Sequence, residues 1–111
     1  MSITTHVLNT ATGLPAEGIE ATLSRLIDGE FSIIAEGITN ADGRIADLLT
    51  DKTLGMGTYR LHFSLEDYFA RHGVNSFYPY ADVVFKVAEA PAHYHIPLLL
   101  SPFGYSTYRG S

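Results

Sequence analysis

Short runs of alternating apolar and polar residues recur along this chain and constrain its fold more than any other feature. Residues 58–64 show the pattern most clearly: Tyr59, Leu61 and Phe63 share one face, and His62 lies on the other. Because the side chains of a strand point alternately to opposite faces, the pattern predicts a β-strand with one buried face. Further strands are expected over residues 4–9, 19–27, 31–39, 45–49, 80–87, 92–100 and 105–108.

Turn signals separate the expected strands. Asp28-Gly29 is typical of a hairpin, and an Asn-Ala-Asp-Gly turn over residues 40–43 is followed at once by Arg44. Seven or eight short strands at this spacing predict an all-β fold, an antiparallel sandwich of two sheets. The 111 residues are enough for a single domain, residues 1–111, with one hydrophobic core.

One short helix is expected between the strands. Ser64 is its predicted N-cap, with Asp67 three residues later in a weak form of the capping box. Leu65 and Tyr68 begin a run of apolar residues at helical spacing, and Gly73 is expected to end the helix.

Charge and composition exclude several functions. The net charge is −5 and the seven Lys and Arg residues are scattered, which argues against binding to nucleic acid. The absence of cysteine excludes disulfides, thiolate nucleophiles and cysteine-ligated zinc. The sequence has neither a signal-peptide pattern nor an apolar run of membrane-spanning length, so it predicts a cytoplasmic protein, or a periplasmic one if a signal peptide was removed before Met1.

Two histidines share one face of an otherwise apolar strand. His93 and His95 are two residues apart, so they point away from the expected core face that carries Tyr94 and Ile96. Pro97 continues the histidine face. Because proline has no N–H to donate, it predicts an edge position or a bulge at this point.

Other candidate residues lie far from this strand in the sequence. His6 is on the first expected strand, and Arg44 follows a turn that would hold its guanidinium at the mouth of a strand pair. Residues 108–111, Tyr-Arg-Gly-Ser, close a strand-like aromatic segment, which suggests that this end is packed and forms part of a site. His62 is interpreted as a solvated strand residue, and His72 as a favourable charge at the end of the helix.

Four segments resemble one known family. THVLNT at 5–10, TNADGR at 39–44, FYPYADVVF at 77–85 and HYHIPLLLSPFGYSTYRGS at 93–111 are similar to the transthyretin-like 5-hydroxyisourate hydrolases. The YRGS ending is the most specific element, because vertebrate transthyretin shares the fold but lacks this ending and this histidine set. The similarity extends over essentially the whole chain.

The resemblance implies a fold, an assembly and a reaction. The fold is an eight-stranded transthyretin-type sandwich, and the assembly is a homotetramer, a dimer of dimers with active sites in the channel between the dimers. The reaction is the hydrolysis of 5-hydroxyisourate, the product of urate oxidation, to 2-oxo-4-hydroxy-4-carboxy-5-ureidoimidazoline, with no metal or other cofactor. By position, the resemblance implies that His6, Arg44 and His95 are catalytic and that His6, Arg44, His93, Tyr108, Arg109 and Ser111 bind the substrate.

These residue types suit that reaction. Opening the ring adds water to an amide-type carbonyl, and a histidine with a pKa near 6.5 is a suitable base at neutral pH. A guanidinium can bind the oxygen that becomes negative, through paired N–H donors. The sequence leaves open whether His6 or His95 is the base.

Two alternative functions remain at this point. His6, His93 and His95 could supply three nitrogens to zinc and leave one position for water. The chain could instead be a binding protein without catalysis, with an apolar ligand in a central channel.

Overall fold

Nine strand segments and one helix form in the computed structural model, which describes residues 2–50, 55–88 and 92–111. The first sheet contains β1 (Ser2–Asn9), β2 (Leu14–Pro15), β5 (Arg44–Leu49), β8 (His93–Ser101) and β9 (Gly104–Thr107). The second sheet contains β3 (Glu20–Ile27), β4 (Glu30–Ile38), β6 (Gly57–Ser64) and β7 (Tyr80–Val87). The helix is α1 (Glu66–Arg71).

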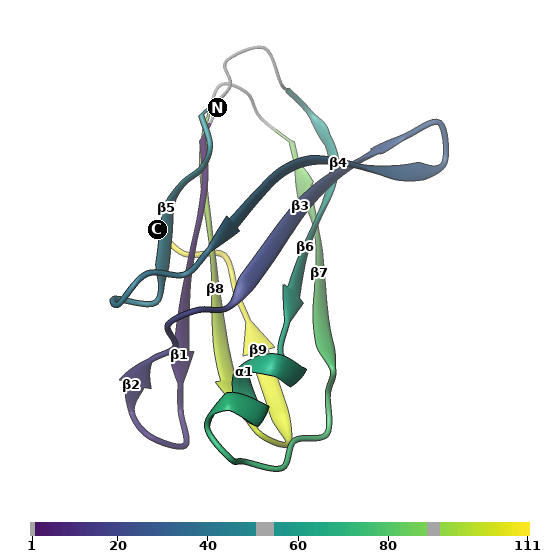
Figure 1. The fold of residues 1–111 in the computed structure, drawn as a ribbon. Coiled ribbons are helices and arrows are strands. Elements are labelled where there is room, and N and C mark those ends of the chain that lie inside the picture. The colour runs from purple at the N-terminus through teal and green to yellow at the C-terminus, as the bar shows by residue number, and fades with distance from the viewer. Residues whose placement is uncertain (1, 51–54, 89–91) are drawn as a thin grey trace.

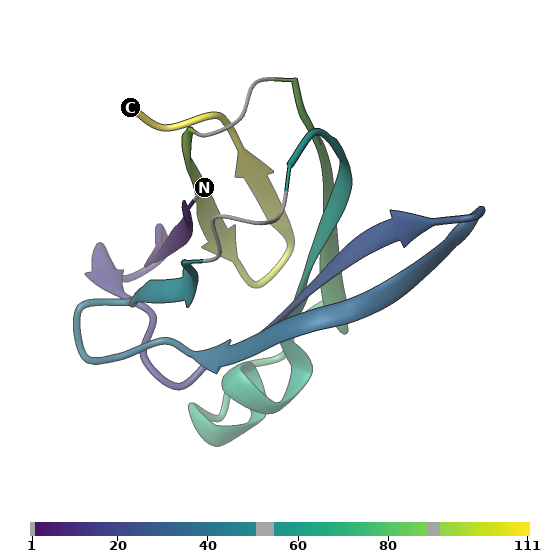
Figure 2. The ribbon, with the colours of Figure 1, turned by 90° about the horizontal axis from the view of Figure 1, so that it is seen from above.

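The two sheets face each other as a sandwich (Figures 1 and 2). The strand order is β2-β1-β8-β9 in one sheet, with β5 also paired to β1, and β4-β3-β6-β7 in the other. The predicted two-sheet sandwich is confirmed, with two differences in detail. A two-residue strand, β2, brings the described strand segments to nine, and β1 pairs with β8 in parallel. A parallel pair is possible here because a long stretch of chain separates the two strands.

The core lies between the sheets and contains the residues predicted for the inward faces. Tyr59, Leu61 and Phe63 on β6 are fully buried, and Tyr94 and Ile96 on β8 expose no more than 5% of their surface. Burying a side chain of this kind stabilises the fold by about 1.5–3 kcal/mol. The buried residues of both sheets form one hydrophobic cluster, which fixes the outward direction of the intervening residues.

Pro97 does not lie on an edge strand, because β8 is between β1 and β9. The predicted edge position is therefore wrong, and no bulge interrupts the β1–β8 register at Pro97 either. The local pairing explains why proline is accepted there. The β8–β9 ladder begins only at Leu98, and the Pro97 carbonyl accepts a hydrogen bond from the Thr107 hydroxyl at 2.7 Å instead. The N–H that proline lacks is therefore not needed, because Pro97 lies outside the part of β8 that pairs regularly with β9.

The helix begins one residue later than predicted. Ser64 still belongs to β6, and the N-cap is Leu65, whose side chain makes no capping hydrogen bond. The backbone N–H groups of Leu65 and Glu66 both donate to the carbonyl of Pro79 at 3.0 Å, so the helix start needs no side-chain cap. Gly73, at φ +66°, follows the helix end as predicted. Among the described residues, no helix has the length and apolarity that crossing a membrane requires.

The β3–β4 hairpin extends beyond the sandwich (Figures 1 and 2). Asp28 and Gly29 at its tip have φ angles of 52° and 82°. Two successive left-handed residues make the turn type that matches the twist of paired strands, so the predicted hairpin is confirmed.

Candidate active site

The outer face of β1 and β8 brings together polar side chains from distant parts of the chain. The parallel register sets Ser2 opposite His93 and Thr4 opposite His95. His6 follows two residues after Thr4 on the same face of β1. One strand pairing therefore aligns three histidines and two hydroxyl groups outside the core.

Arg44 joins this face because β5 pairs with β1. Its Cα is the register partner of His6. The turn that precedes it is held by Asn40, whose side-chain oxygen accepts the backbone N–H groups of Asp42 and Arg44 at 2.9 and 3.0 Å. Gly43 has φ +72°, and a Cβ there would collide with the backbone of β1, so glycine allows the turn to approach β1 this closely.

A surface depression of about 240 Å³ opens between these elements. It is lined by Thr4, Thr5, Arg44, Ala46, His93, His95 and Ser111. Ser111 at the C-terminus and Arg44 and Ala46 on β5 thus line the same depression. Of the predicted site residues, Arg44, His93, His95 and Ser111 meet at this concave site, whereas His6 does not line it.

Hydrogen bonds hold the two histidines of β8 in place. Nδ1 of His95 lies 2.7 Å from the Thr4 hydroxyl, and Nδ1 of His93 lies 2.7 Å from the Ser2 hydroxyl. The two imidazole rings are nearly parallel, with centroids 6.4 Å apart and an angle of 10° between their planes. The strand pairing thus fixes both the positions and the ring orientations of these histidines.

The electrostatic environment keeps His95 neutral. Partial burial lowers the pKa of His95 below its usual 6.5, and electrostatic interactions with Arg44, His93 and His6 lower it further. A hydrogen bond with Thr4 has the opposite, smaller effect on this pKa. At neutral pH the His95 side chain therefore has a nitrogen lone pair free to accept a proton.

The last residues of the chain fold over His95. The Gly110 N–H donates to the His95 carbonyl at 2.8 Å. A Cβ at Gly110 would lie 2.5 Å from Cδ2 of the His95 ring, so only glycine lets the backbone pass this close. Ser111 then reaches the depression. The predicted packing of the chain end holds only at Gly110, which is half-buried against the imidazole, whereas Tyr108, Arg109 and Ser111 are exposed.

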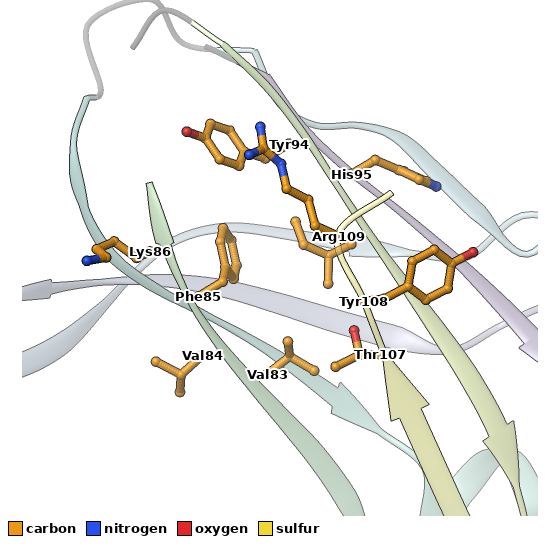
Figure 3. Close-up of a pocket in the computed structure, with 10 residues that line it drawn as sticks. Val83, Val84, Phe85, Lys86, Tyr94, His95, Thr107, Tyr108 and Arg109 are labelled. Carbon is orange, nitrogen blue, oxygen red and sulfur yellow. The ribbon is translucent and has the colours of Figure 1, made fainter. Parts of the chain in front are cut away.

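Tyr108 and Arg109 lie at a neighbouring cavity of about 260 Å³ rather than in the depression. This cavity lies between β7 and the β8–β9 side of the other sheet (Figure 3). The guanidinium carbon of Arg109 lies 4.5 Å from the ring centroid of Tyr94, and the His95 side chain points away from the cavity (Figure 3). His95 is the only residue that lines both this cavity and the depression. Within one chain, Tyr108 and Arg109 therefore do not lie beside Arg44.

Among the residues missed at the sequence level, Thr4 and Gly110 contact His95 directly. Thr4 and His6 are two residues apart on β1. The alternation of side chains along a strand could therefore have identified Thr4 as a neighbour of His6 on the outer face. Gly110 could not be interpreted without knowing that the chain end crosses His95. His62 was interpreted as solvated, but its Nδ1 is 2.6 Å from the Asp82 carboxylate and its ring centroid is 4.9 Å from that of Tyr80.

The three-histidine alternative finds no support in the arrangement of these side chains. Across residues 2–50, 55–88 and 92–111, no three His, Cys, Asp or Glu side chains are grouped closely enough to hold a metal ion. Nδ1 of His93 and Nδ1 of His95 each meet a hydroxyl group of β1 instead.

Comparison with protein families identifies the relatives of this chain. The model described as the HIUase/Transthyretin family matches residues 3–110. A curated 5-hydroxyisourate hydrolase of Mus musculus is 48% identical over 111 residues, which cover 98% of this chain and 94% of the mouse protein.

Solved structures resemble the chain over its whole length. The 5-hydroxyisourate hydrolase of Klebsiella pneumoniae has a TM-score of 0.87 and 40% identity, with 100% of each chain covered. Sea bream transthyretin, solved in complex with thyroxine, has a TM-score of 0.93 and 34% identity, with 99% of this chain and 95% of that chain covered. Backbone similarity thus does not separate a hydrolase from a transthyretin, and the side chains must decide.

Proposed function

We propose that this chain, which belongs to the HIUase/Transthyretin family, hydrolyses 5-hydroxyisourate in the breakdown of urate. The observation that carries the proposal is the neutral His95 beside the guanidinium of Arg44 in a concave site. Relatives named as 5-hydroxyisourate hydrolases support it, with 48% identity in the mouse protein and 45% in that of Halalkalibacterium halodurans.

In this proposal His95 is the general base. Its uncharged imidazole takes a proton from water as the water adds to the ring carbonyl. Arg44 binds the carbonyl oxygen as it becomes negative, through charge-assisted N–H donors. His6, which faces Arg44 across the β1–β5 pair, orients the substrate or returns the proton to the ring nitrogen that leaves.

The remaining predicted site residues bind the substrate. Ser111 and His93 line the depression, and the Ser111 hydroxyl can donate a hydrogen bond to a planar ring with several carbonyl groups. Tyr108 and Arg109 are proposed to contact the substrate as well. Because they open onto the neighbouring cavity, this role needs a second copy of the chain to bring its own residues to the site.

A homotetramer, formed as a dimer of dimers, would supply that second copy. The outward position of the site and the exposure of Tyr108, at 57%, agree with an additional protein surface above it. Size-exclusion chromatography with light scattering should give about four times the chain mass of 12.1 kDa. A monomer of full activity would remove the tetramer from the proposal. A cytoplasmic location stays a prediction.

One assay tests the reaction against its alternatives. The protein is mixed with freshly prepared 5-hydroxyisourate, and ring opening is followed optically above the spontaneous rate. Acceleration that survives exhaustive chelation supports a metal-independent hydrolase, and acceleration lost on chelation supports the zinc alternative. Binding of thyroxine-like apolar ligands without acceleration would favour a carrier and contradict the proposal.

A further inference from the structure

A line of four side chains connects His95 to the solvent side of β8. The Ser2 hydroxyl is 2.7 Å from Nδ1 of His93, and Nε2 of His93 is 3.4 Å from the Thr4 hydroxyl. The same hydroxyl is 2.7 Å from Nδ1 of His95. Thr4 therefore lies between the two imidazoles and is within reach of one nitrogen from each.

We propose that Thr4 is a positioning residue that fixes the tautomer of His95 and passes the proton released there to the exposed His93. The inference rests on the proposed function, because it assigns the relay to the base of that reaction. It adds a route by which the proton taken up by His95 leaves the site, and Arg44 does not provide such a route.

The chain of hydrogen bonds has two consistent directions. In one, Nδ1–H of His95 donates to Thr4, Thr4 donates to Nε2 of His93, and Nδ1–H of His93 donates to Ser2. Nε2 of His95 then carries the lone pair and is a base. In the other direction every donor is reversed, Nε2 of His95 carries the hydrogen, and His95 is an acid. A hydroxyl group is suited to this role since it both donates and accepts.

The passage of one proton along this line, in successive transfers, converts the first direction into the second. When Nε2 of His95 gains a proton from the attacking water, its Nδ1 proton moves to the Thr4 oxygen, and the Thr4 hydroxyl proton moves to Nε2 of His93. His95 is left neutral with hydrogen on Nε2, and His93 is left as the cation. His93 is exposed, so it loses this proton to water. The 3.4 Å step is longer than an ordinary hydrogen bond, and a small rotation of the His93 ring must shorten it.

The charges around His95 favour this export. Arg44 on β5, His6 on β1 and His93 on β8 face the His95 ring, and the end of the chain at Ser111 lines the same depression. A second positive charge held at His95 is close to Arg44. Moving that charge to His93 places it where water solvates it and screens it from the guanidinium.

The test compares Thr4→Val, which removes the hydroxyl at nearly constant volume, with Thr4→Ser, which keeps it. Thr4→Val should lower kcat by about 10²-fold, the lower end of what positioned proton transfer contributes, with little change in KM. Thr4→Ser should restore most of the rate. His93→Gln should lower kcat similarly, and added imidazole buffer should rescue both Thr4→Val and His93→Gln. Thr22→Val, a half-buried threonine on the outer face of the other sheet, is the matched control and should keep the wild-type rate.

Nitrogen NMR of the His95 ring gives a readout that needs no substrate. In the free protein Thr4→Val should change the balance of the Nδ1–H and Nε2–H tautomers, and Thr4→Ser should not. An unchanged tautomer balance in Thr4→Val overturns the positioning role, even if the protein hydrolyses 5-hydroxyisourate. A wild-type rate for His93→Gln overturns the relay. A wild-type protein without hydrolase activity overturns the proposed function, and the tautomer measurement still decides whether Thr4 positions His95.

Discussion

Two histidines on the outer faces of the two sheets differ only in their neighbours. His95 on β8 and His62 on β6 both alternate with core residues, and both make a short contact through Nδ1, at 2.7 and 2.6 Å. The partner of His62 is the carboxylate of Asp82, whereas that of His95 is the hydroxyl of Thr4. His95 also faces Arg44 and two further histidines, and its pKa is lowered.

The comparison shows that the partner, not the strand position, decides what a histidine can do. His62 is paired with a carboxylate on the sheet that does not carry Arg44. His95 lies beside Arg44, has a lowered pKa and can act as a base.

Exchanging each histidine for asparagine should separate the two faces most strongly. His95→Asn should reduce kcat by about 10²–10⁴-fold, the range typical of a lost general base. His62→Asn should leave kcat near the wild-type value, because His62 lies on the other sheet. Steady-state assays of both variants measure this, with circular dichroism to check that each is folded. Equal losses in the two variants would remove His95 from the chemistry.

Arg44→Gln should have the next largest effect. Losing one donor to the developing oxyanion costs about 2.7–4 kcal/mol of barrier, or roughly 10²–10³-fold in kcat. Arg44→Lys keeps the charge but not the paired donors, so it should recover only part of this loss. Full recovery by lysine would mean that charge alone is needed.

The same substitution should shift the pH dependence in a known direction. After burial, the charge of Arg44 is the next largest cause that lowers the pKa of His95, so Arg44→Gln should raise this pKa toward 6.5. Neutral His95 is the active form, so kcat/KM is full above its pKa and falls as the pH drops through it. The acid limb should therefore move to higher pH in Arg44→Gln and stay in place in Arg44→Lys. NMR titration of the His95 ring measures the pKa independently.

Extending the chain after Ser111 should also reduce activity. A tag there displaces the residues that fold over His95, and misplacement by about 1 Å can cost up to about 10²-fold. The same tag placed before Met1 should be tolerated much better. Equal rates for the two tagged proteins would show that the chain end takes no part in the site.

Asp82→Asn should have the smallest effect, and on stability only. The His62–Asp82 pair is about one-third exposed, at 33% and 35%, so its loss should lower the free energy of unfolding by about 0.2–1 kcal/mol. The loss should shrink at high salt, because exposed charges are screened. Urea unfolding at low and high salt measures it. A change in kcat would contradict the separation of the two faces.

Much of the fold could be predicted because its signals are local. Alternation identified the buried faces of β6 and β8, and Asp28-Gly29 identified the hairpin. The errors concern contacts made by distant residues. The carbonyl of Pro79 replaced the predicted side-chain cap, and the placement of β8 between two partners contradicted the edge position of Pro97.

In the candidate site too, the features that could not be predicted are those that depend on contacts between distant residues. The resemblance to a known family supplied Arg44 and the histidines, which lie around one depression or beside it. The roles of Thr4 and Gly110 depend on the parallel β1–β8 pairing and on the path of the chain end, neither of which has a local signal. The carboxylate partner of His62 likewise follows from the register of β6 and β7.

Because β1 pairs with β8, the first sheet cannot form completely until the last part of the chain has been synthesised. Thr4 leaves the ribosome 91 residues before His95, its strand partner. At the usual rate of translation this interval lasts about 5–20 s, during which β1 has one edge without its native neighbour. An unpaired edge invites association with other strands. β2 and β5 pair with the opposite edge of β1, so this edge stays open until β8 has been synthesised.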